Sequence, residues 1–288
     1  MSYASTCRYV IADVFSDTPL EGNQLGVFTD AQRIPEALLQ KLARELNFSE
    51  TVFCYPAEGE GDVRIRIFTP AKELPFAGHP VLGAAFVLAA PLQLGAIKLE
   101  TGRGIVEIVL ERDGGRIRFG RMSQPLPTVQ PFERSTELLR ALELERSTLP
   151  IELYDNGIQH VFVGLESERA VAALAPDAAT LVRLGAIGVN CFARAENRWK
   201  TRVFVPAFGI FEDPATGSAA GPLALHLARH GLIPFGEEIE IRQGEEIGRP
   251  SALFACAFGS KEAVERVEVG GRAVIVARGE FRFAGIAG

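Results

Sequence analysis

Three polar residues stand beside apolar segments in positions where they could do chemistry: Glu50, His79 and Asp213. Glu50 lies between the end of an expected helix and the apolar strand 52–55, and burial against that strand would raise the pKa of its carboxyl group. A carboxyl group with a pKa near neutrality can take up a proton and return it. The alternative interpretation of Glu50 is an ordinary acidic residue in an exposed loop.

His79 and Asp213 each lie where a turn leads into an apolar helix. His79 stands at the expected cap position of the first helix, between Gly78 and Pro80, although histidine is a poor helix cap. It is either a functional group or a hydrogen-bonded loop histidine. Asp213 comes just before the second helix, and the competing interpretation is an aspartate that only stabilises the turn before Pro214.

The sequence offers little support for metal or cofactor chemistry. His226 and His230 are four residues apart and could share one helix face, but no third ligand is apparent, and the dipole favours histidines in a last helical turn. The segment 102–107 has glutamate where a dinucleotide-binding loop needs its third glycine. The segment 216–220 lacks the nucleophile elbow of serine hydrolases. We therefore expect neither a metal nor a cofactor.

The composition excludes several classes of partner. The chain has 288 residues and a net charge of −6, which argues against the broad basic surface of a protein that binds nucleic acid or anionic membranes. Its longest apolar stretch, 81–97, is interrupted by Pro91 and Gln93, and a membrane-spanning helix needs roughly 20 residues. The four cysteines are widely spaced, which favours free thiols in a reducing compartment. We expect a cytoplasmic protein without a signal peptide.

Local patterns predict the elements that must position these residues. Alternating runs rich in Val, Ile and Phe predict strands over residues 9–15, 25–28, 62–68, 97–99, 105–111 and 115–119. A leucine stripe predicts a helix over 35–46, with Pro35 at its first position and Asn47 as a left-handed stop. The pattern is typical of a mixed fold with much antiparallel sheet.

Parts of the sequence occur twice. Phe-Thr-Pro at 68–70 is echoed by Phe-Val-Pro at 204–206, an offset of 204 − 68 = 136. The glycine turns at Gly78 and Gly217 differ by 217 − 78 = 139, and 23–28 aligns loosely with residues 158–163. These offsets predict an internal duplication, the alternative being chance similarity between two strand–turn–helix units.

The proline-rich segment 122–132 is expected to link the two halves. We therefore predict an N-terminal half over 1–121 and a C-terminal half over 122–276, with a C-terminal strand over 277–288 as a candidate addition to the first half. If the halves are duplicates, an active site between them would face two helix N-termini. Such a site would favour a small anion, for example a carboxylate.

The chain resembles the PhzF family of phenazine-biosynthesis isomerases. The similar segments are Gly-Asn at 22–23, Asn-Phe-Ser-Glu-Thr at 47–51, the two segments 66–70 and 73–80, and Glu-Asp-Pro-Ala-Thr-Gly-Ser-Ala at 212–219, followed by 160–164, 221–231 and 246–251. Gln24 departs from the family, in which proline commonly follows Gly-Asn. The resemblance implies an α+β, diaminopimelate-epimerase-like fold, with two pseudo-repeated halves that are each a curled, mainly antiparallel sheet around a central helix. It also implies a homodimer.

The resemblance further implies proton transfer without a cofactor, on the substrate trans-2,3-dihydro-3-hydroxyanthranilate. Glu50 would take the proton from C3 and return one to C1, while His79 and Asp213 would bind the amine and hydroxyl groups and stabilise charge in the transition state. The polar groups of the substrate would also be held by Ser49, Gly78, Gly217 and Ser218. The cysteine pair of related racemases is replaced here by His79 and Asp213, which excludes their two-thiol mechanism.

Two other functions remain open. One is an isomerase of the same fold that acts on a different small amino or hydroxy acid. The other is a non-catalytic protein that binds a small carboxylate. The joint presence of Glu50, His79 and Asp213 argues against the binding protein, because binding an anion does not need two additional acids.

Overall fold

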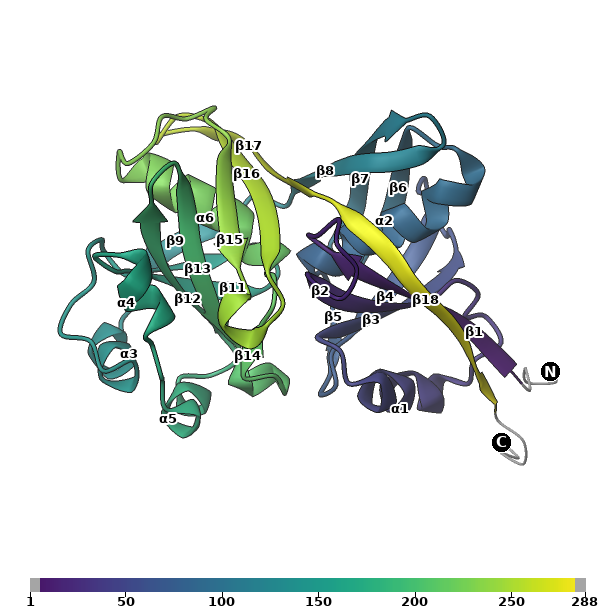
Figure 1. Ribbon diagram of the computed structural model, residues 1–288, viewed down its shortest axis with the longest axis horizontal. Helices are drawn as coiled ribbons and strands as arrows, with labels where there is room; N and C mark the ends of the chain where they lie inside the picture. Colours follow the sequence, from purple (N-terminus) through teal and green to yellow (C-terminus); the bar gives the residue numbers. More distant parts are fainter. Residues whose placement is uncertain (1–5, 283–288) are drawn as a thin grey trace. The chain divides into compact units, whose positions relative to one another are not determined.

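The computed structural model describes residues 6–282, and the chain divides into two compact units. Unit 1 comprises Met1–Met122 and Arg272–Gly288, and unit 2 comprises Ser123–Gly271. In Figure 1, unit 1 therefore contains both the purple N-terminal strand and the yellow C-terminal strand. None of the helices within 6–282 is long and apolar enough to cross a membrane.

Unit 1 is a curled mixed sheet in which most neighbouring strands are antiparallel. Its strands are β1 (Thr6–Val14), β2 (Asn23–Phe28), β3 (Glu50–Pro56), β4 (Val63–Phe68), β5 (Glu73–Leu74), β6 (Ala96–Thr101), β7 (Gly104–Asp113), β8 (Arg116–Gln124) and β18 (Ala273–Arg282). They pair in the order β18-β1-β2-β3-β4-β6-β7-β8, with β5 also on β4. Only the β2–β3 and β4–β6 pairs are parallel. The predicted strands are all present, most of them with longer bounds, although β4 begins one residue later and β1 ends one residue earlier than predicted.

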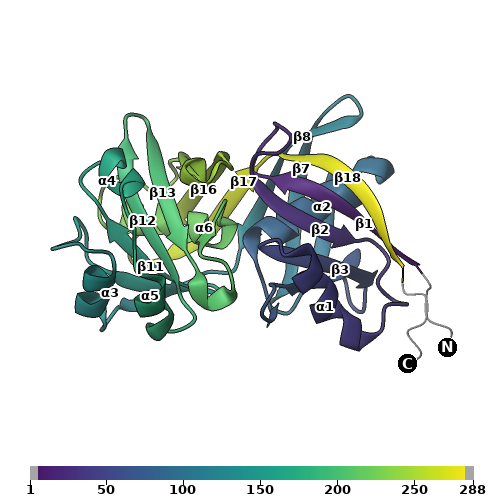
Figure 2. The same cartoon turned by 60° about the horizontal axis from the view of Figure 1, so that its bottom comes forward.

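The central helix of unit 1 is α2 (Gly78–Leu92), which packs against β1, β2, β3, β6, β7 and β18 (Figure 2). Its residues are apolar on all sides, as expected of a helix surrounded by sheet. Gly83 permits the close approach, because a Cβ there would lie 2.5 Å from Leu25 Cδ2 and 2.6 Å from Val14 Cγ2. The absence of a side chain at Gly83 therefore sets the distance between helix and sheet.

The second helix of unit 1 is α1 (Glu36–Leu46), close to the predicted range. Leu38, Leu39 and Leu42 form its buried stripe. Asn47 ends the helix in the left-handed conformation with φ 53°, as predicted. Pro35 is the N-cap and not the first helical residue, because its ψ of 136° is extended.

Unit 2 repeats the strand order of unit 1. Its strands are β9 (Thr128–Pro131), β10 (Glu152–Asp155), β11 (Gln159–Gly164), β12 (Gly188–Ala195), β13 (Arg198–Phe204), β14 (Glu212–Asp213), β15 (Ile239–Gln243), β16 (Ser251–Gly259) and β17 (Val264–Gly271). They pair in the order β9-β10-β11-β12-β13-β15-β16-β17, with β14 on β13, and β11–β12 and β13–β15 are parallel. The parallel pairs fall at the same places as in unit 1.

The central helix of unit 2 is α6 (Gly217–Arg229), and most of its residues are fully buried. It packs against β11, β16 and β17. The remaining helical segments are α3 (Ser135–Ala141), α4 (Glu168–Ala172), α5 (Ala178–Arg183), η1 (Pro206–Phe208) and η2 (Glu245–Ile247). Each unit therefore consists of a sheet around one buried helix, as the resemblance implied.

The segments near the boundaries differ from the sequence expectation. The boundary between the units, at Met122 and Ser123, falls within the segment 122–132, but this segment is not irregular throughout, because β8 continues to Gln124 and β9 forms an antiparallel pair with β10. Proline is tolerated at such an edge strand, and Pro131 stands at its end. The chain returns to unit 1 at Arg272, and β18 pairs with β1 along Ala273–Arg282. The rest of the predicted C-terminal strand, 283–288, lies outside the described residues.

Candidate active site

In unit 1, the fold brings Glu50 and His79 together. Glu50 is the first residue of β3 and lies opposite Leu25 in the parallel β2–β3 pair. His79 is the second residue of α2, and its Nδ1 lies 3.4 Å from Glu50 Oε2. The side chains of His79 and Glu50 are 3% and 13% exposed. A carboxylate and an imidazole, 29 residues apart in the chain, thus share one largely buried place.

Burial determines the charge of His79. Loss of solvation lowers the pKa of His79 to about 3, and a backbone hydrogen bond at Gln24 offsets this only partly. His79 is therefore neutral near pH 7, and its contact with Glu50 is not an attraction between opposite charges. Asn23 adds a second polar contact, with Nδ2 lying 3.2 Å from His79 Nδ1. A neutral imidazole in this place can orient and hydrogen-bond a ligand.

The first turn of α2 has no polar cap. Ala77 is the N-cap, no side chain caps the helix, and the first turn carries no acidic residue. The expectation that His79 caps the helix is therefore wrong, because the helix begins at Gly78, one residue earlier. An uncapped N-terminus leaves N–H groups and the positive end of the helix dipole to face an anion. The candidate residue Ser49, outside this helix, is buried and directly precedes Glu50.

In unit 2, Asp213 is held by a hydrogen-bonded network at β14. The hydroxyl of Thr216 donates to Asp213 Oδ2 over 2.6 Å. The side-chain amide of Gln243 donates to the backbone carbonyl of Asp213 over 2.7 Å and to Thr216 Oγ1 over 2.9 Å. Asp213, Thr216 and Gln243 are all buried. The carboxylate therefore has a defined orientation four residues before α6.

Ser218 occupies the place in α6 that His79 occupies in α2, the second residue of the helix. His160 Nε2 lies 3.0 Å from Ser218 Oγ, and the Asn156 amide donates to the Ser218 carbonyl over 2.9 Å. The Gln124 amide donates to the Gly217 carbonyl over 2.8 Å. Burial lowers the pKa of His160 to about 4, with partial opposition from Asp155, so His160 is neutral near pH 7.

In each unit, an arginine–glutamate ion pair joins the two strands that precede the central helix. In unit 1, Arg66 Nε and Nη2 each lie 2.7 Å from the carboxylate of Glu73 in β5. In unit 2, Arg202 forms the corresponding pair with Glu212 in β14, over 2.9 and 2.7 Å. Arg202 also donates to the Leu174 carbonyl over 2.6 Å. Both pairs lie at the same place in the strand order of their unit. The duplication therefore includes the ion pairs that hold the short strand before each central helix.

Several of these polar residues received no role from the sequence. Asn23 and His160 belong to segments that carry the family resemblance, but nothing there indicates that they contact His79 and Ser218. Asn156 and Gln243 lie outside every segment that the sequence patterns single out. The sequence signal that could point to these residues is a polar side chain next to an apolar strand. Such side chains are common at strand ends for other reasons, so this signal does not single out a functional site.

The cysteines are not placed for thiol chemistry. All four are free and buried, and none stands at the start of α2 or α6. Burial raises the pKa of Cys54 to about 12, and it also raises the pKa of Cys191. These thiols remain protonated and unreactive at neutral pH.

Two units of one topology, each with polar groups at the first turn of a buried central helix, define an α+β fold of the epimerase type. The chain belongs to the PhzC-PhzF family, whose model, described as phenazine biosynthesis-like protein, matches residues 12–279. The solved structure of a hydroxyproline epimerase from Agrobacterium vitis, with bound trans-4-hydroxy-L-proline, has a TM-score of 0.69 at 14% identity. It covers 98% of this chain and 94% of its own, which shows a shared fold.

Relatives with clearer sequence similarity exist. A curated protein of Pseudomonas fluorescens named trans-2,3-dihydro-3-hydroxyanthranilate isomerase is 52% identical over 94% of this chain and 98% of its own length. The solved structure of a predicted epimerase from Pseudomonas aeruginosa is 32% identical, with a TM-score of 0.81 over 96% of this chain and 99% of that one. The similarity to both relatives extends over almost the whole chain.

Proposed function

We propose that this protein is an isomerase that converts trans-2,3-dihydro-3-hydroxyanthranilate into the aminoketone precursor of phenazines. The observation that carries the proposal is the buried contact between Glu50 and a neutral His79. The 52% identity to a protein named for this activity, over 94% of the chain, supports the choice of substrate. No cofactor takes part in the proposed reaction.

In the proposed mechanism, Glu50 moves the proton. Its carboxylate takes the proton from C3 of the substrate, and the resulting carboxylic acid returns a proton to C1 on the same face of the ring. The double bonds shift, and the enol formed becomes a ketone. Because burial lowers the pKa of His79 to about 3, its imidazole is too weak a base to compete with Glu50 for the proton, and its role is to hydrogen-bond a polar group of the substrate.

We propose that the residues of unit 2 serve the same reaction. Asp213 would bind the substrate amine or hydroxyl group, as its fixed orientation favours. Gly217 and Ser218 would bind the substrate carboxylate through the first turn of α6, and Ser49 and Gly78 would provide further polar contacts in unit 1. The absence of a side-chain cap and of acidic residues in both first turns supports anion binding there.

The test is to incubate the purified protein with trans-2,3-dihydro-3-hydroxyanthranilate in deuterated water and follow the diene absorbance and the product mass. We expect loss of the diene with each turnover. Unchanged absorbance at high enzyme concentration would refute the proposed substrate. Deuterium entering a different small amino or hydroxy acid would identify an isomerase of other specificity.

The assembly and location are also proposals. We propose a homodimer, which the family resemblance implies, and a cytoplasmic location, since the four buried free cysteines suit a reducing compartment. Light scattering after gel filtration should give twice the chain mass of 31.2 kDa. A mass of one chain at micromolar concentration would contradict the dimer, and recovery in the periplasmic fraction would contradict the location.

A further inference from the structure

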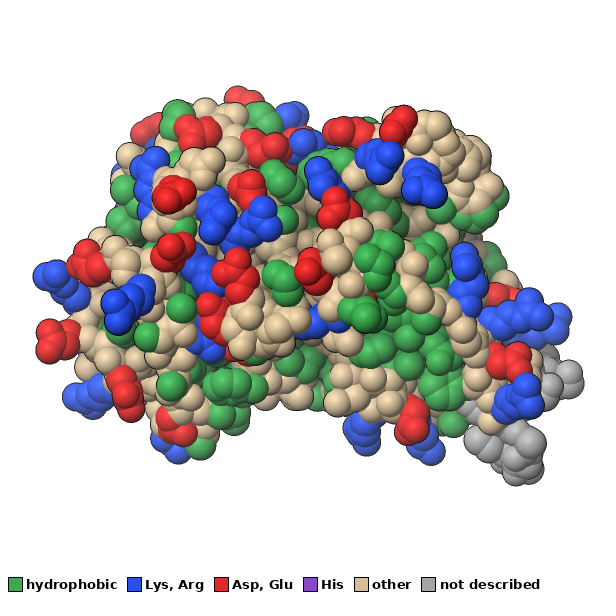
Figure 3. Space-filling model, in the orientation of Figure 1, with side chains coloured by type: hydrophobic (Ala, Val, Ile, Leu, Met, Phe, Trp, Pro, Cys, Tyr) green, Lys and Arg blue, Asp and Glu red, His purple; other side chains and the backbone are tan. Residues whose placement is uncertain are grey.

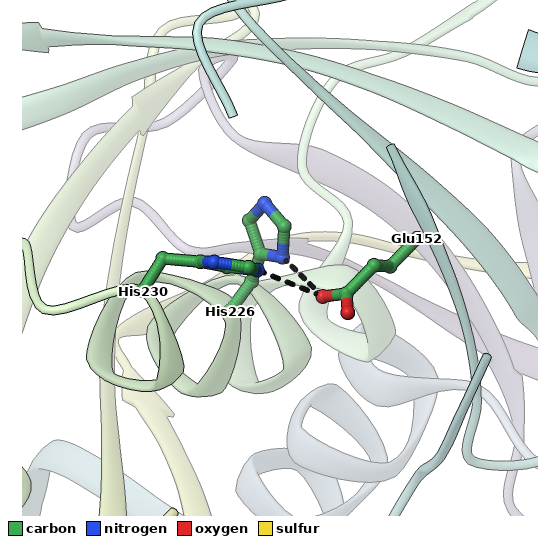
Figure 4. Close-up of side chains that lie close together, drawn as sticks. All are labelled: Glu152, His226 and His230. Atoms are coloured by element: carbon green, nitrogen blue, oxygen red, sulfur yellow. Dashed lines mark hydrogen bonds and ion pairs between the residues drawn. The ribbon is translucent and has the colours of Figure 1, made fainter. Parts of the chain in front are cut away.

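A second group of polar side chains lies at the C-terminal end of α6. It consists of Glu152 from β10, His226 in the last turn of α6, and His230, the C-cap residue. Figure 4 shows both imidazole rings and the carboxylate pointing toward one another. His226 is eight residues beyond Ser218, a rise of about 12 Å along the helix. The group is therefore separate from the proposed substrate contacts of unit 2.

Three donors converge on one oxygen of this group. Glu152 Oε2 lies 3.2 Å from His226 Nδ1, 3.0 Å from His230 Nε2 and 3.0 Å from the hydroxyl oxygen of Tyr154. A carboxylate oxygen offers about two lone pairs, and the Tyr154 hydroxyl also lies 3.1 Å from His226 Nδ1, so the three contacts need not all be hydrogen bonds to Oε2. The Nη2 atom of Arg229 lies 3.8 Å from the other oxygen, Oε1. The site is crowded with nitrogen and oxygen atoms that can bind a cation.

We propose that Glu152, His226 and His230 bind one divalent transition-metal ion of the zinc type. Two nitrogens and one carboxylate oxygen are a common zinc ligand set. Around a tetrahedral zinc ion with bonds of about 2 Å, neighbouring ligand atoms are about 3.3 Å apart. The two nitrogen–oxygen distances of 3.0 and 3.2 Å already approach this value, and all three ligand atoms lie within 4.8 Å of one another.

The ligand chemistry suits a metal ion. A neutral imidazole carries its proton on one ring nitrogen and offers a lone pair on the other. When a metal binds, each imidazole carries its proton on the other ring nitrogen, and Glu152 Oε2 is released from both histidine hydrogen bonds.

Tyr154 and Arg229 would form the outer shell of the site. The Tyr154 hydroxyl donates to Glu152 Oε2 over 3.0 Å and also lies 3.1 Å from His226 Nδ1, so it contacts both ligands. Such donors orient the ligands of a metal site. The Arg229 guanidinium lies on the Oε1 side, so the metal ion would bind through Oε2. The positive charge of the guanidinium lowers the affinity of the site for a cation, and we therefore expect moderate affinity.

The bound ion would join α6 to β10 within unit 2. Its consequence is stability, because a ligand that binds the folded state alone raises the unfolding temperature. We expect tag-free protein, first dialysed against a chelator, to bind one Zn²⁺ per chain by calorimetry. Added Co²⁺ should give the visible absorption of a tetrahedral site, and Zn²⁺ should raise the unfolding temperature.

The variants Glu152→Gln and His230→Gln test the ligands while retaining polar side chains. Each should weaken Zn²⁺ binding at least tenfold and remove the temperature shift, with an unchanged circular dichroism spectrum. Glu237→Gln, an exposed carboxylate in the same unit, is the matched control and should bind Zn²⁺ as the wild type does. Failure of the wild type to bind one equivalent, or binding unaffected by both ligand variants, would overturn the proposal.

Discussion

At the scale of single residues, the environment of Glu50 and His79 decides what each can do. Both are largely buried, and the lowered pKa of His79, about 3, makes its imidazole a weak base, so the proposed proton transfer is assigned to the carboxylate. A protonated His79 would neutralise Glu50 and reduce its basicity. Burial of the imidazole therefore keeps the adjacent carboxylate available as a base.

Replacement of Glu50 by glutamine should abolish turnover without disturbing the fold. Glutamine has nearly the same shape but cannot accept the proton, and loss of a general base commonly lowers kcat by about 10²–10⁴-fold. Steady-state kinetics with the dihydro-hydroxyanthranilate and a binding measurement with its product-like analogue 3-hydroxyanthranilate would separate the two effects. We expect kcat to fall and binding to persist. A variant with the wild-type rate would remove Glu50 from its proposed role.

The buried histidines should make the protein sensitive to acid. The pKa of an unfolded histidine is about 6.5, whereas those of His79 and His160 are about 3 and 4 in the folded state. Between these values the unfolded chain binds protons that the folded chain does not. Stability should therefore fall as the pH drops below about 6.5, by up to about 1.4 kcal/mol per pH unit for each histidine.

Urea unfolding at several pH values between 7 and 5 checks this expectation. The variants His79→Asn and His160→Asn each remove one of the two groups, so each should flatten the dependence of unfolding free energy on pH. If both variants retain the wild-type slope, neither histidine is the source of the acid sensitivity.

At the scale of elements, the two arginine–glutamate pairs occupy equivalent places but differ in exposure. The side chains of Arg66 and Glu73 are 22% and 42% exposed, and Arg66 also contacts the exposed Glu36. The side chains of Arg202 and Glu212 are 9% and 3% exposed. Solvent screens the first pair, whereas the loss of one partner in the second leaves a buried charge alone.

This difference provides a matched pair of variants. Arg202→Met should destabilise the protein by about 3–5 kcal/mol, because Glu212 would remain buried without its partner. Arg66→Met should cost about 1 kcal/mol, because water can solvate the exposed carboxylates. Urea unfolding followed by circular dichroism measures both. Equal losses would contradict the explanation by burial.

At the scale of the whole molecule, unit 2 is one continuous segment inserted into unit 1. Unit 1 is completed only when β18 pairs with β1 after the chain has passed through unit 2.

On the face shown in Figure 3, positive and negative side chains are interspersed. The net charge of −6 therefore does not correspond to one uniformly acidic surface on that face.

The insertion predicts different behaviour for two fragments. Residues 123–271 contain every strand pair of unit 2 described above, so this fragment should fold alone and unfold cooperatively on heating. Residues 1–122 lack β18, which leaves the edge of β1 without its partner, and we expect this fragment to aggregate or remain unfolded. Circular dichroism and amide NMR spectra of both would test the idea. A well-folded 1–122 fragment would show that β18 is dispensable.

Local patterns in the sequence determine most of the elements of unit 1. Alternation predicts its strands, the leucine stripe and Asn47 predict α1, and repeated segments indicate the duplication. The sequence neighbours of Glu50 and His79 single them out as candidate site residues. These features are readable because the periods of helices and strands involve residues close together in the chain.

Contacts between distant segments were decided only by the tertiary structure. The sequence does not predict the strand β9, because its pairing with β10, and not its own composition, makes it a strand. Asn23 reaches His79 across 56 residues, and Glu152 meets His226 across 74. No third ligand for the two histidines is apparent from the sequence, because strand register and helix packing bring Glu152 to them. These are properties of the folded chain and not of any local segment.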